Sequence, residues 1–482
     1  MSTKNNNPIA VGLDIGTTKI VAMVGRKNDH GKLEILGVGR AKSLGVQRGI
    51  VNNITQTVNA IKEAVAQAEA DSGIKIKEVT VGVAGQHIRS LQHSDYITRP
   101  NFEEVIDEND LKRLINQVYN LVMLPGEEII HVLPQEFRID SDSETHEPLG
   151  MYGNRLEANF HVVVGQIASI KNIARCVKSA GLSLAGITLE PIASSNASLS
   201  DEEKEAGVAL VDIGGGTTDI AVFKDNVIRH TAVIPFGGNV ITDDVKTGCS
   251  IIEKQAELLK VKFGSAWPGE NKETDIVAIP GLRGREPKEI SVKKLSQIIH
   301  ARIHEILEQV YMELRHYGCE DNKKKLIAGI VLTGGGSKLK HIRQLTEYIT
   351  GFDVRIGFSN EHLAGGQSEL ISSPEYATAV GLVMSGIEQL ELRYQGHEED
   401  EEFFEDTPSN ISSAIEQEEI EKEKEKEVFD SPIETGIVKA ANLNTGDKNP
   451  KQETPSKSPM KSKSNVWSEW ANKFIKMINE ID

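Results

Sequence analysis

The sequence contains one internal repeat, and no other feature constrains the fold as strongly. Residues 9–24, IAVGLDIGTTKIVAMV, recur in modified form as residues 208–223, VALVDIGGGTTDIAVF. Each copy predicts a strand, a tight turn rich in glycine and threonine, and a second strand. Because the copies lie about 200 residues apart, they indicate a duplicated fold in which two hairpins face each other across a cleft.

Length and composition favour an α/β protein with several compact units. The chain has 482 residues, of which 5% are aromatic. Up to about residue 390, short apolar runs alternate with amphipathic segments such as 53–70 and 291–317, a pattern that suits sheets covered by helices. The three cysteines, Cys176, Cys249 and Cys319, lie far apart without a CxxC pair, so the sequence indicates neither a disulfide framework nor a zinc site.

The distribution of charge excludes some functions and marks a linker. The net charge of −17 argues against general nucleic-acid binding. Residues 396–434 hold 16 acidic residues against 3 lysines, a local balance of −13, so most of the excess lies there. The N-terminus has no signal-peptide pattern, and no apolar run approaches the roughly 20 residues that span a bilayer. We therefore expect a cytoplasmic protein.

Each hairpin predicts a phosphate site that includes a metal ion. Asp14 and Asp212 each end an apolar strand, and glycines with paired threonines follow. Such turns offer main-chain N–H groups and hydroxyls to phosphate oxygens. A carboxylate repels phosphate, so the arrangement suits a hydrated Mg²⁺ between them. One such hairpin alone is more often an ordinary glycine turn, but two matching copies favour the nucleotide interpretation.

Two further glycine motifs complete the set. Residues 327–337, IAGIVLTGGGS, predict a buried strand, a glycine turn and then a helix over 338–350. Residues 235–238, PFGG, precede a helical stretch in which Glu257 and Lys260 lie three residues apart on one face. Strand, glycine turn and helix form a weak signal by themselves, and the Glu257 and Lys260 pair alone suggests a solvated salt bridge.

Taken together, these motifs carry a family resemblance. DIGTTK, DIGGGTTD, PFGGN, AELLK and LTGGGS resemble the nucleotide motifs of the actin, heat-shock chaperone and sugar-kinase ATPase superfamily. Residues 189–195, LEPIASS, and 376–382, YATAVGL, resemble its two interdomain connections. Within this superfamily the chain is most similar to the FtsA family of bacterial cell-division proteins. The resemblance covers about residues 8–390 and the final helix, and it includes residues 81–165, which resemble the subdomain inserted in that family.

The resemblance implies a binding site for ATP and Mg²⁺. Asp14 and Asp212 are assigned to the Mg²⁺ side, through water, and Glu190 either to the positioning of a hydrolytic water or to a polar hinge. We expect at most slow ATP hydrolysis and no metabolic activity. The residues assigned to the nucleotide are Gly16, Thr17, Thr18, Lys19, Gly214, Gly215, Gly216, Thr217, Thr218, Gly237, Gly238, Glu257, Lys260, Gly334, Gly335, Gly336 and Ser337.

The resemblance also implies a division into domains. We expect an α/β, duplicated actin-like fold with two lobes around a nucleotide cleft. The predicted segments are the first lobe over 8–80, 166–200 and 377–395, the inserted subdomain over 81–165, the second lobe over 201–376 with a small subdomain at about 242–321, a disordered charged linker over 396–465, and an amphipathic helix over 466–482.

The partners implied by the family are the tubulin-like division protein FtsZ, later division proteins and other copies of the chain. FtsZ is expected to bind the small subdomain. Positive charge for its acidic tail is offered there by Arg285, Lys293, Lys294 and Arg302. Each of these residues alone is more often part of a solvated helix face. The inserted subdomain is expected to contact the next subunit of a filament. A pilus-assembly adaptor resembling PilM and a small-molecule kinase of the same fold are the alternatives, and a chaperone is disfavoured because only a charged linker follows the ATPase unit.

The C-terminal segment predicts a membrane-binding helix. At 3.6 residues per turn one stripe collects the apolar residues Trp467, Trp470, Phe474, Met477, Ile478 and Ile481. Several lysines precede the stripe, as an interfacial helix on anionic lipid requires. Docking on the protein's own core is the alternative, but the long linker favours a distant surface. We therefore expect the protein at the cytoplasmic face of the cell membrane, at the division site.

Overall fold

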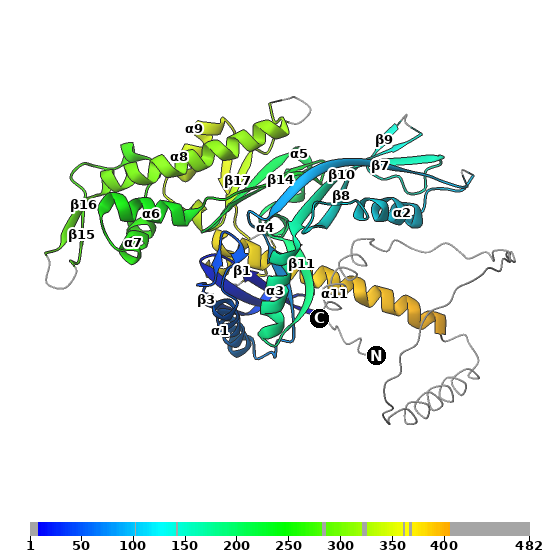
Figure 1. Ribbon diagram of the computed structural model, residues 1–482, viewed down its shortest axis with the longest axis horizontal. Helices are drawn as coiled ribbons and strands as arrows, with labels where there is room; N and C mark the ends of the chain where they lie inside the picture. Colours follow the sequence, from blue (N-terminus) through cyan, green and yellow to red (C-terminus); the bar gives the residue numbers. More distant parts are fainter. Residues whose placement is uncertain are drawn as a thin grey trace, which may run out of the picture. The chain divides into compact units, whose positions relative to one another are not determined.

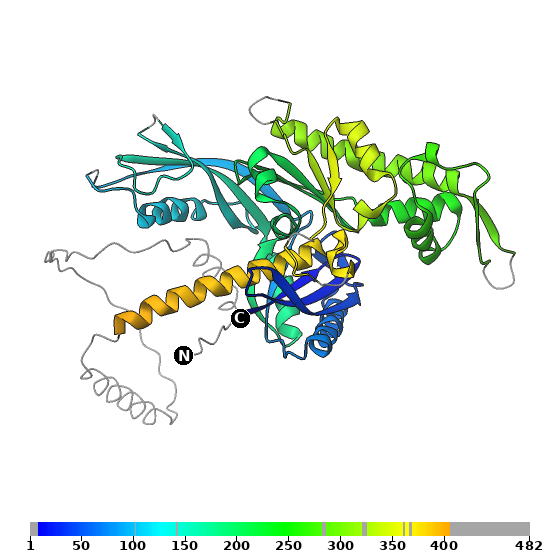
Figure 2. The same ribbon diagram turned by 180° about the vertical axis from the view of Figure 1, so that it is seen from behind.

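The computed structural model describes residues 8–404 except 102, 141–142, 282–285, 321–324, 360–361 and 366–368. The described residues up to Glu391 lie in one compact unit. Figures 1 and 2 show it from two opposite sides. The predicted membrane helix and most of the predicted linker lie outside the described residues.

The first lobe is built on a five-stranded sheet. Its strand order is β11-β6-β1-β2-β3. The bounds are β1 (Ile9–Ile15), β2 (Lys19–Lys27), β3 (Leu33–Lys42), β6 (Glu78–Val83) and β11 (Ser183–Leu189). Short strands β4 (Val46–Gln47) and β5 (Ile50–Val51) pair beside it.

Successive side chains of β2 point to opposite faces of this sheet, and different helices cover the two faces. Ile20, Ala22 and Val24 belong to the core beneath α1 (Ile54–Ser72) and α3 (Ile167–Ser179), which lie side by side in Figure 1. Val21 and Met23 point the other way, into a core shared with the start of α11 (Ala377–Phe404). Both faces are apolar, so the sheet is buried on both sides.

The second lobe repeats this arrangement. Its sheet has the order β14-β13-β12-β17-β18. β12 pairs antiparallel with β13 and parallel with β17, just as β1 pairs with β2 and β6. The duplicated fold predicted from the repeat is therefore confirmed. The strands are β12 (Val208–Ile213), β13 (Thr218–Lys224), β14 (Val227–Ile234), β17 (Ile330–Thr333) and β18 (Val354–Ile356).

Helices of the second lobe cover its sheet and form the small subdomain (Figure 1). The long helix α8 buries an apolar stripe that includes Leu295, Ile299 and Ile303, while its opposite face is polar. The elements are α6 (Gly238–Cys249), α7 (Glu253–Phe263), η1 (Pro268–Glu270), β15 (Ile276–Ile279), β16 (Lys288–Ser291), α8 (Val292–Tyr317) and α9 (Ile342–Thr350).

Two predicted elements of this lobe begin later than the sequence suggests. The strand predicted from Ile327 starts at Ile330, because Gly329 has φ +69° and a side chain there would lie 2.2 Å from the Asp353 carbonyl oxygen. The helix predicted from Lys338 is a short 3₁₀ turn, η3 (Gly335–Lys338). The α-helix α9 follows only after His341, whose φ of 62° interrupts the helical geometry.

The inserted subdomain is a four-stranded sheet with one helix. The strand order is β7-β10-β8-β9, and α2 (Glu108–Tyr119) packs on one face. The strands are β7 (Ile88–Thr98), β8 (Glu127–Ile139), β9 (Ser143–Thr145) and β10 (Arg155–Gln166). Residue 81 lies in β6, in the core of the first lobe, so the insertion starts after Val83 and slightly later than the sequence boundary.

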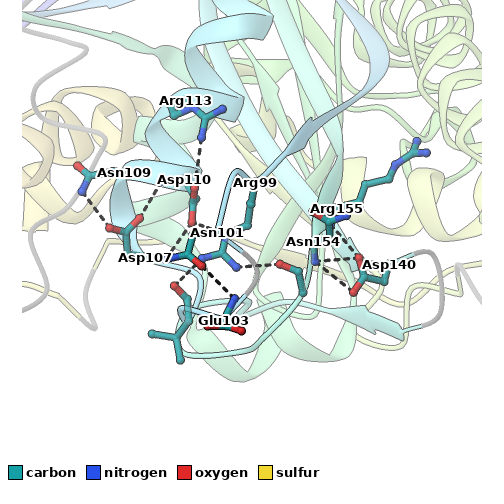
Figure 3. A network of polar contacts seen from close by, with 12 residues as sticks. Arg99, Asn101, Glu103, Asp107, Asn109, Asp110, Arg113, Asp140, Asn154 and Arg155 are labelled. Carbon is teal, nitrogen blue, oxygen red and sulfur yellow. Dashed lines mark hydrogen bonds and ion pairs between the residues drawn. The ribbon is translucent and has the colours of Figure 1, made fainter. Parts of the chain in front are cut away.

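A buried arginine holds the far end of this subdomain together (Figure 3). Arg99 is 5% exposed, and its guanidinium bonds Asp110 of α2 at 2.7 Å. Two further N–H groups donate to the main-chain oxygens of Gly153 and Val105, each at 2.8 Å. Because a buried charge is tolerated only with such partners, this network fixes the end of β7, the start of α2 and the loop before β10 relative to one another.

The inserted subdomain also contacts the second lobe, at the edge strand β14. The hydroxyl of Ser90 donates to the Thr231 main-chain oxygen at 2.8 Å, and the Gln92 amide donates to the Arg229 oxygen at 3.3 Å. His161, 1% exposed, meets the Thr231 hydroxyl at 2.9 Å. β14 and β7 are both edge strands, and side chains of the insertion satisfy the carbonyls that β14 leaves unpaired.

Two connections join the lobes. The first runs through α4 (Glu190–Ser198) and α5 (Asp201–Ala206), and the second runs through the 3₁₀ turn η4 (Pro374–Tyr376) into α11. A side chain on Gly381 of α11 would lie 1.8 Å from the Ala193 carbonyl oxygen of α4, so the two connections are in direct backbone contact.

Helix α11 continues to Phe404, past residue 396 where the linker is predicted to begin, because the glutamates there favour helix. Among the helices in the described part of the chain, none is long and apolar enough to cross a bilayer.

Candidate nucleotide site between the lobes

The turns of the two repeated hairpins meet at the centre of the molecule. A side chain on Gly215 would lie 2.2 Å from the Thr18 methyl group, and one on Gly216 would lie 2.5 Å from the Thr17 hydroxyl. The turns of the two lobes are thus packed against each other as the repeat predicts, with glycine required where they approach most closely. In the second turn the predicted hydroxyls are bonded within the protein, because Thr217 donates to Asp219 and Thr218 to the Phe236 main-chain oxygen, each at 2.9 Å.

Asp212 is fixed by residues from both connections. Its Oδ2 accepts a hydrogen bond of 2.8 Å from Ser194 of α4 and one of 3.3 Å from Thr378 of α11. The two hydroxyls also contact each other at 2.9 Å. Asp212, the residue before the last of β12, lies beside Thr333 of β17, so its carboxylate is at the carboxyl edge of two parallel strands. This edge is where α/β sheets commonly bind ligands.

Four carboxylates gather at the site, and their pKa values are displaced upward. Burial raises the pKa of Asp14 to about 6, while Lys19 opposes and Asp212 adds to the shift. Burial and the neighbouring Asp212 raise the pKa of Asp219 to about 7. The pKa of Glu190 is raised well above its ordinary value by burial and by the charges of Asp14, Asp219 and Asp212, and burial also raises that of Asp212.

This excess of carboxylates fits a hydrated cation. The Asp219 Oδ1 is buried without a hydrogen-bond partner among the described residues. Within the same residues, no group of three or more histidine, cysteine, aspartate or glutamate side chains is arranged to ligate a metal directly. A Mg²⁺ ion that keeps several waters needs only one or two carboxylates and supplies the missing positive charge. Asp14 and Asp212 are the residues suited to hold it through water.

The PFGG turn is bound to the second hairpin. The N–H of Gly238 donates to the Gly214 oxygen at 2.9 Å, and a side chain on Gly237 would lie 2.6 Å from that same oxygen. The Lys260 ammonium donates to the Gly238 oxygen at 2.8 Å and pairs with Glu257 at 2.7 Å. The ion pair of Glu257 and Lys260 therefore lies beside the turn and holds α7 against it, rather than standing isolated in solvent.

The three glycines of the GGGS turn have different environments. Gly334 has φ +78°, and a side chain there would lie 2.2 Å from the Asp212 Oδ1. A side chain on Gly336 would lie 2.3 Å from Ile213. Gly335 has no atom within 4 Å of its ideal Cβ position, so it borders open space. Ser337 caps the turn by donating to the Gly334 oxygen at 2.7 Å. Gly335 is therefore the position where a ligand has room.

Lys19 is directed toward the second connection. Its ammonium donates to the main-chain oxygen of Glu375, lies 3.6 Å from the carboxylate of the same residue and stands 4.3 Å from the Tyr376 ring centre. Burial lowers the pKa of Lys19, while Asp14 and Glu375 oppose that shift. The cation next to the predicted phosphate turn is thus bound to the hinge between the lobes.

The sequence alone does not indicate several residues of the site. Ser194 and Thr378 lie in the two connection helices and have no local motif that indicates contact with Asp212. Glu375 is likewise a single glutamate in a turn. The sequence does indicate Asp219, because this residue is the last of the DIGGGTTD motif and takes the place that Lys19 has in the first copy.

Three of the four predicted partner residues lie on α8 and have different surroundings. Lys293 pairs with Glu273 at 2.6 Å, and Arg302 is held by Asp244 at 2.6 Å and by Glu305. Lys294 is exposed on α8. Arg285 lies outside the described residues, as do the predicted membrane residues Trp467, Trp470, Phe474, Met477 and Ile478.

Two lobes with one strand order, joined by two connections around paired phosphate-type hairpins, define an actin-like ATPase fold. The family comparison gives the particular branch. Residues 209–381 match the model described as "Cell division protein FtsA", and residues 85–164 match that of the SHS2 domain inserted in FtsA. The chain belongs to the FtsA family of actin-like cell-division proteins.

Relatives named "Cell division protein FtsA" match most of the chain. The protein of Pseudomonas aeruginosa is 38% identical over 389 residues, which are 81% of this chain and 92% of the relative. That of Neisseria meningitidis is 39% identical over 77% of this chain and 88% of its own length. That of Escherichia coli K12 is 32% identical over 80% and 92%, respectively. The similarity thus includes both lobes and the insertion.

One solved structure supports the assignment of the fold. The PilM-PilN type IV pilus biogenesis complex has a chain with a TM-score of 0.56 and 16% identity, covering 78% of this chain and 98% of that one. A similarity at this identity shows the fold alone. The pilus-assembly alternative therefore rests on architecture only, whereas the match to FtsA proteins rests on sequence across about four fifths of the chain.

Proposed function

We propose that the cleft binds ATP with Mg²⁺ and that the nucleotide controls assembly of the protein into filaments. The observation that carries the proposal is the direct approach of the two glycine turns beside Asp14 and Asp212. The main-chain N–H groups of the turns and the hydroxyls of Thr17 and Thr18 suit phosphate oxygens. When bound, Mg²⁺ neutralises phosphate charge and carries the waters that the two aspartates accept.

The geometry favours slow hydrolysis. Glu190 lies against Gly82, where a side chain would approach its Cγ at 2.8 Å, and its pKa is raised by burial and by three neighbouring aspartates. The Glu190 carboxyl is packed into the interior of the first lobe, where it suits a polar hinge that at most orients a water. ATP then acts chiefly as a ligand that sets the arrangement of the lobes.

Titration calorimetry with ATP tests the site. Wild-type protein should bind ATP in the presence of Mg²⁺ and bind it weakly when the ion is chelated. Asp212→Asn keeps the shape of the side chain but removes the charge. It should therefore reduce the affinity for ATP measured with Mg²⁺ more than the affinity measured without the metal. Equal ATP affinity with and without Mg²⁺ would contradict the assignment of the aspartates.

We further propose that the protein links FtsZ to the membrane and recruits later division proteins. The family assignment supports a division role. Lys294 on the exposed face of α8 supports contact with an acidic tail, and the terminal stripe of tryptophans supports attachment to anionic lipid at the cytoplasmic face. A single short helix binds lipid weakly, so a filament that displays many helices would attach more firmly.

Fluorescence imaging in dividing cells tests this combined role. The protein should form a ring at the division site, and the ring should depend on the last 17 residues. A diffuse signal for the full chain would contradict the division role, whereas a ring that persists without the terminal segment would contradict only the anchoring role.

A further inference from the structure

Three cations converge on one carboxylate in the second connection between the lobes. Glu375 lies 3.1 Å from Lys338, 3.6 Å from Lys19 and 3.9 Å from Arg40. Its side chain is 18% exposed, so these pairs are only partly screened by solvent. The cations come from separate segments: Lys19 begins β2, Arg40 lies in β3, and Lys338 ends the GGGS turn.

Two of these cations neighbour the candidate nucleotide site. Lys19 directly follows Thr17 and Thr18 of the phosphate turn, and Lys338 directly follows the Gly335 to Ser337 stretch. Lys19 is 13% exposed and is held by both the carboxylate and the main-chain oxygen of Glu375. The positive charge best placed to meet a phosphate group is therefore already paired within the protein.

We propose that Glu375 is a positioning residue that competes with nucleotide phosphates for Lys19, and that ATP binding thereby loosens the contact between the phosphate turn and the second connection. The proposal rests on the proposed function, because it needs ATP in the cleft. A carboxylate 3.6 Å from Lys19 lowers the positive potential that the ammonium presents to phosphate oxygens. When phosphate takes Lys19, the first lobe loses one of its two charged contacts with Glu375 and keeps only the longer one, from Arg40.

Calorimetry with two ligands separates this effect from a general change of the cleft. Glu375→Gln preserves the main-chain bond to Lys19 and removes only the charge. We expect this variant to bind ATP about two- to fivefold more tightly, the effect of a partly exposed ion pair. Its affinity for adenosine should stay the same, because adenosine has no phosphate for Lys19 to meet. Glu34→Gln, which removes the partner of Arg26 elsewhere on β3, is the matched control and should change neither affinity.

A second variant tests whether the effect passes through Lys19. In a Lys19→Met background, which should bind ATP more weakly, Glu375→Gln should give no further gain in affinity. Without nucleotide, acetylation of Lys19 followed by mass spectrometry should be faster in Glu375→Gln than in wild type. Thermal unfolding of each variant verifies that it is folded, and the single variant with the two ligands is informative even if the double variant is unstable.

The outcomes distinguish this proposal from the proposed function. If wild-type protein binds no ATP, the proposed function fails and the competition fails with it. If wild type binds ATP but Glu375→Gln binds it no more tightly, binds adenosine equally more tightly, or keeps its gain without Lys19, only the competition is overturned. Unchanged acetylation of Lys19 would also overturn it, since the carboxylate then does not restrain the ammonium.

Discussion

The side-chain amide of Gln135, in the inserted subdomain, donates a hydrogen bond of 3.2 Å to the main-chain oxygen of Arg229, in the second lobe. The guanidinium of Arg229 in turn pairs with Glu136 at 2.9 Å. The insertion grows out of the first lobe between β6 and α3, so these bonds make a third link between the lobes besides the two connections. Movement of the insertion and movement of the second lobe are therefore coupled.

Removing this link should loosen β14 without unfolding the insertion. In the double variant Gln92→Leu and Gln135→Leu, the main-chain oxygens of Ile228 and Arg229 lose these donors, at a cost of about 1 kcal/mol for each bond. Hydrogen–deuterium exchange should increase in the inserted subdomain and β14 at their contact. Gln117→Leu is the control, because Gln117 bonds only Asp95 and Tyr96 within the insertion. Equal exchange in the double variant and wild type would show that the two glutamine side chains do not hold the contact.

Acidification should destabilise the same contact through His161. Burial, with a smaller effect of His230, lowers the pKa of His161 to about 4, whereas in the unfolded chain the value is near 6.5. A lowered folded pKa means that the unfolded state binds the extra proton, so stability is full above about pH 6.5 and is lost as the pH falls toward 4, by up to about 3 kcal/mol. Neutral His161 accepts from Gln92 and donates to Thr231, and a second ring proton would face the Gln92 amide.

Urea unfolding at several pH values measures this dependence. His161→Gln should flatten the loss of unfolding free energy between pH 6.5 and 4, whereas His30→Gln in an exposed turn should leave the profile as in wild type. A profile that is equally steep in His161→Gln would assign the acid sensitivity to other groups, such as the buried His87 and His131, whose pKa values burial also lowers to about 4.

The GGGS turn offers a paired test of ligand space against folding. Gly335→Val places its side chain where the structure has open space, so the protein should stay as stable as wild type while ATP affinity falls at least tenfold. Gly336→Val meets Ile213 at 2.3 Å and should destabilise the second lobe itself. Thermal unfolding and calorimetry on both variants check this. If Gly335→Val bound ATP with wild-type affinity, the nucleotide would not lie beside this glycine.

Contact with an acidic tail peptide should depend more on Lys294 than on Lys293. Lys293 is paired with Glu273 at 2.6 Å, so its charge is already partly neutralised. We expect Lys294→Glu to weaken binding of the FtsZ tail severalfold and Lys293→Glu to have the smaller effect, with both effects decreasing as salt is added. Fluorescence anisotropy with a labelled tail peptide is the measurement. If the variant with both substitutions bound the tail peptide with wild-type affinity, these two residues of α8 would not belong to the binding site.

Membrane binding should depend on the apolar stripe of the terminal segment. Trp470→Glu or Phe474→Glu places a charge within the stripe and should release the protein from anionic liposomes while leaving ATP binding unchanged. Glu469→Gln, outside the stripe, is the matched control. Cosedimentation with liposomes measures the difference, and wild-type sedimentation of the Trp470 variant would refute the interfacial helix.

The sequence predicts the parts of the fold that repeat and the parts whose chemistry is local. Both hairpins and the α/β class follow from local patterns, since each pattern needs only its own residues to be recognised, whereas the insertion follows from the family resemblance of residues 81–165. Contacts between distant segments do not follow in this way. The hydrogen bond of Ser194 to Asp212 and the pairing of Lys19 with Glu375 join positions that are 18 and 356 residues apart, and no periodicity connects them.

The small errors at element ends have a similar origin. The late start of α9 depends on the left-handed backbone of His341, whose ring nitrogen contacts the hydroxyl of Ser265, a residue of another segment, at 2.9 Å. The start of the insertion after Val83 depends on the packing of β6 between β1 and β11, a contact that only the folded sheet reveals.

The contact between Gly381 and Ala193 joins the two connections at one point. A side chain at position 381 would lie 1.8 Å from the Ala193 carbonyl oxygen, so the two helices can approach this closely only with glycine there. Displacement in a rotation grows with distance from the axis, so a slight turn of the lobes about this point would give its largest shift at their outer ends.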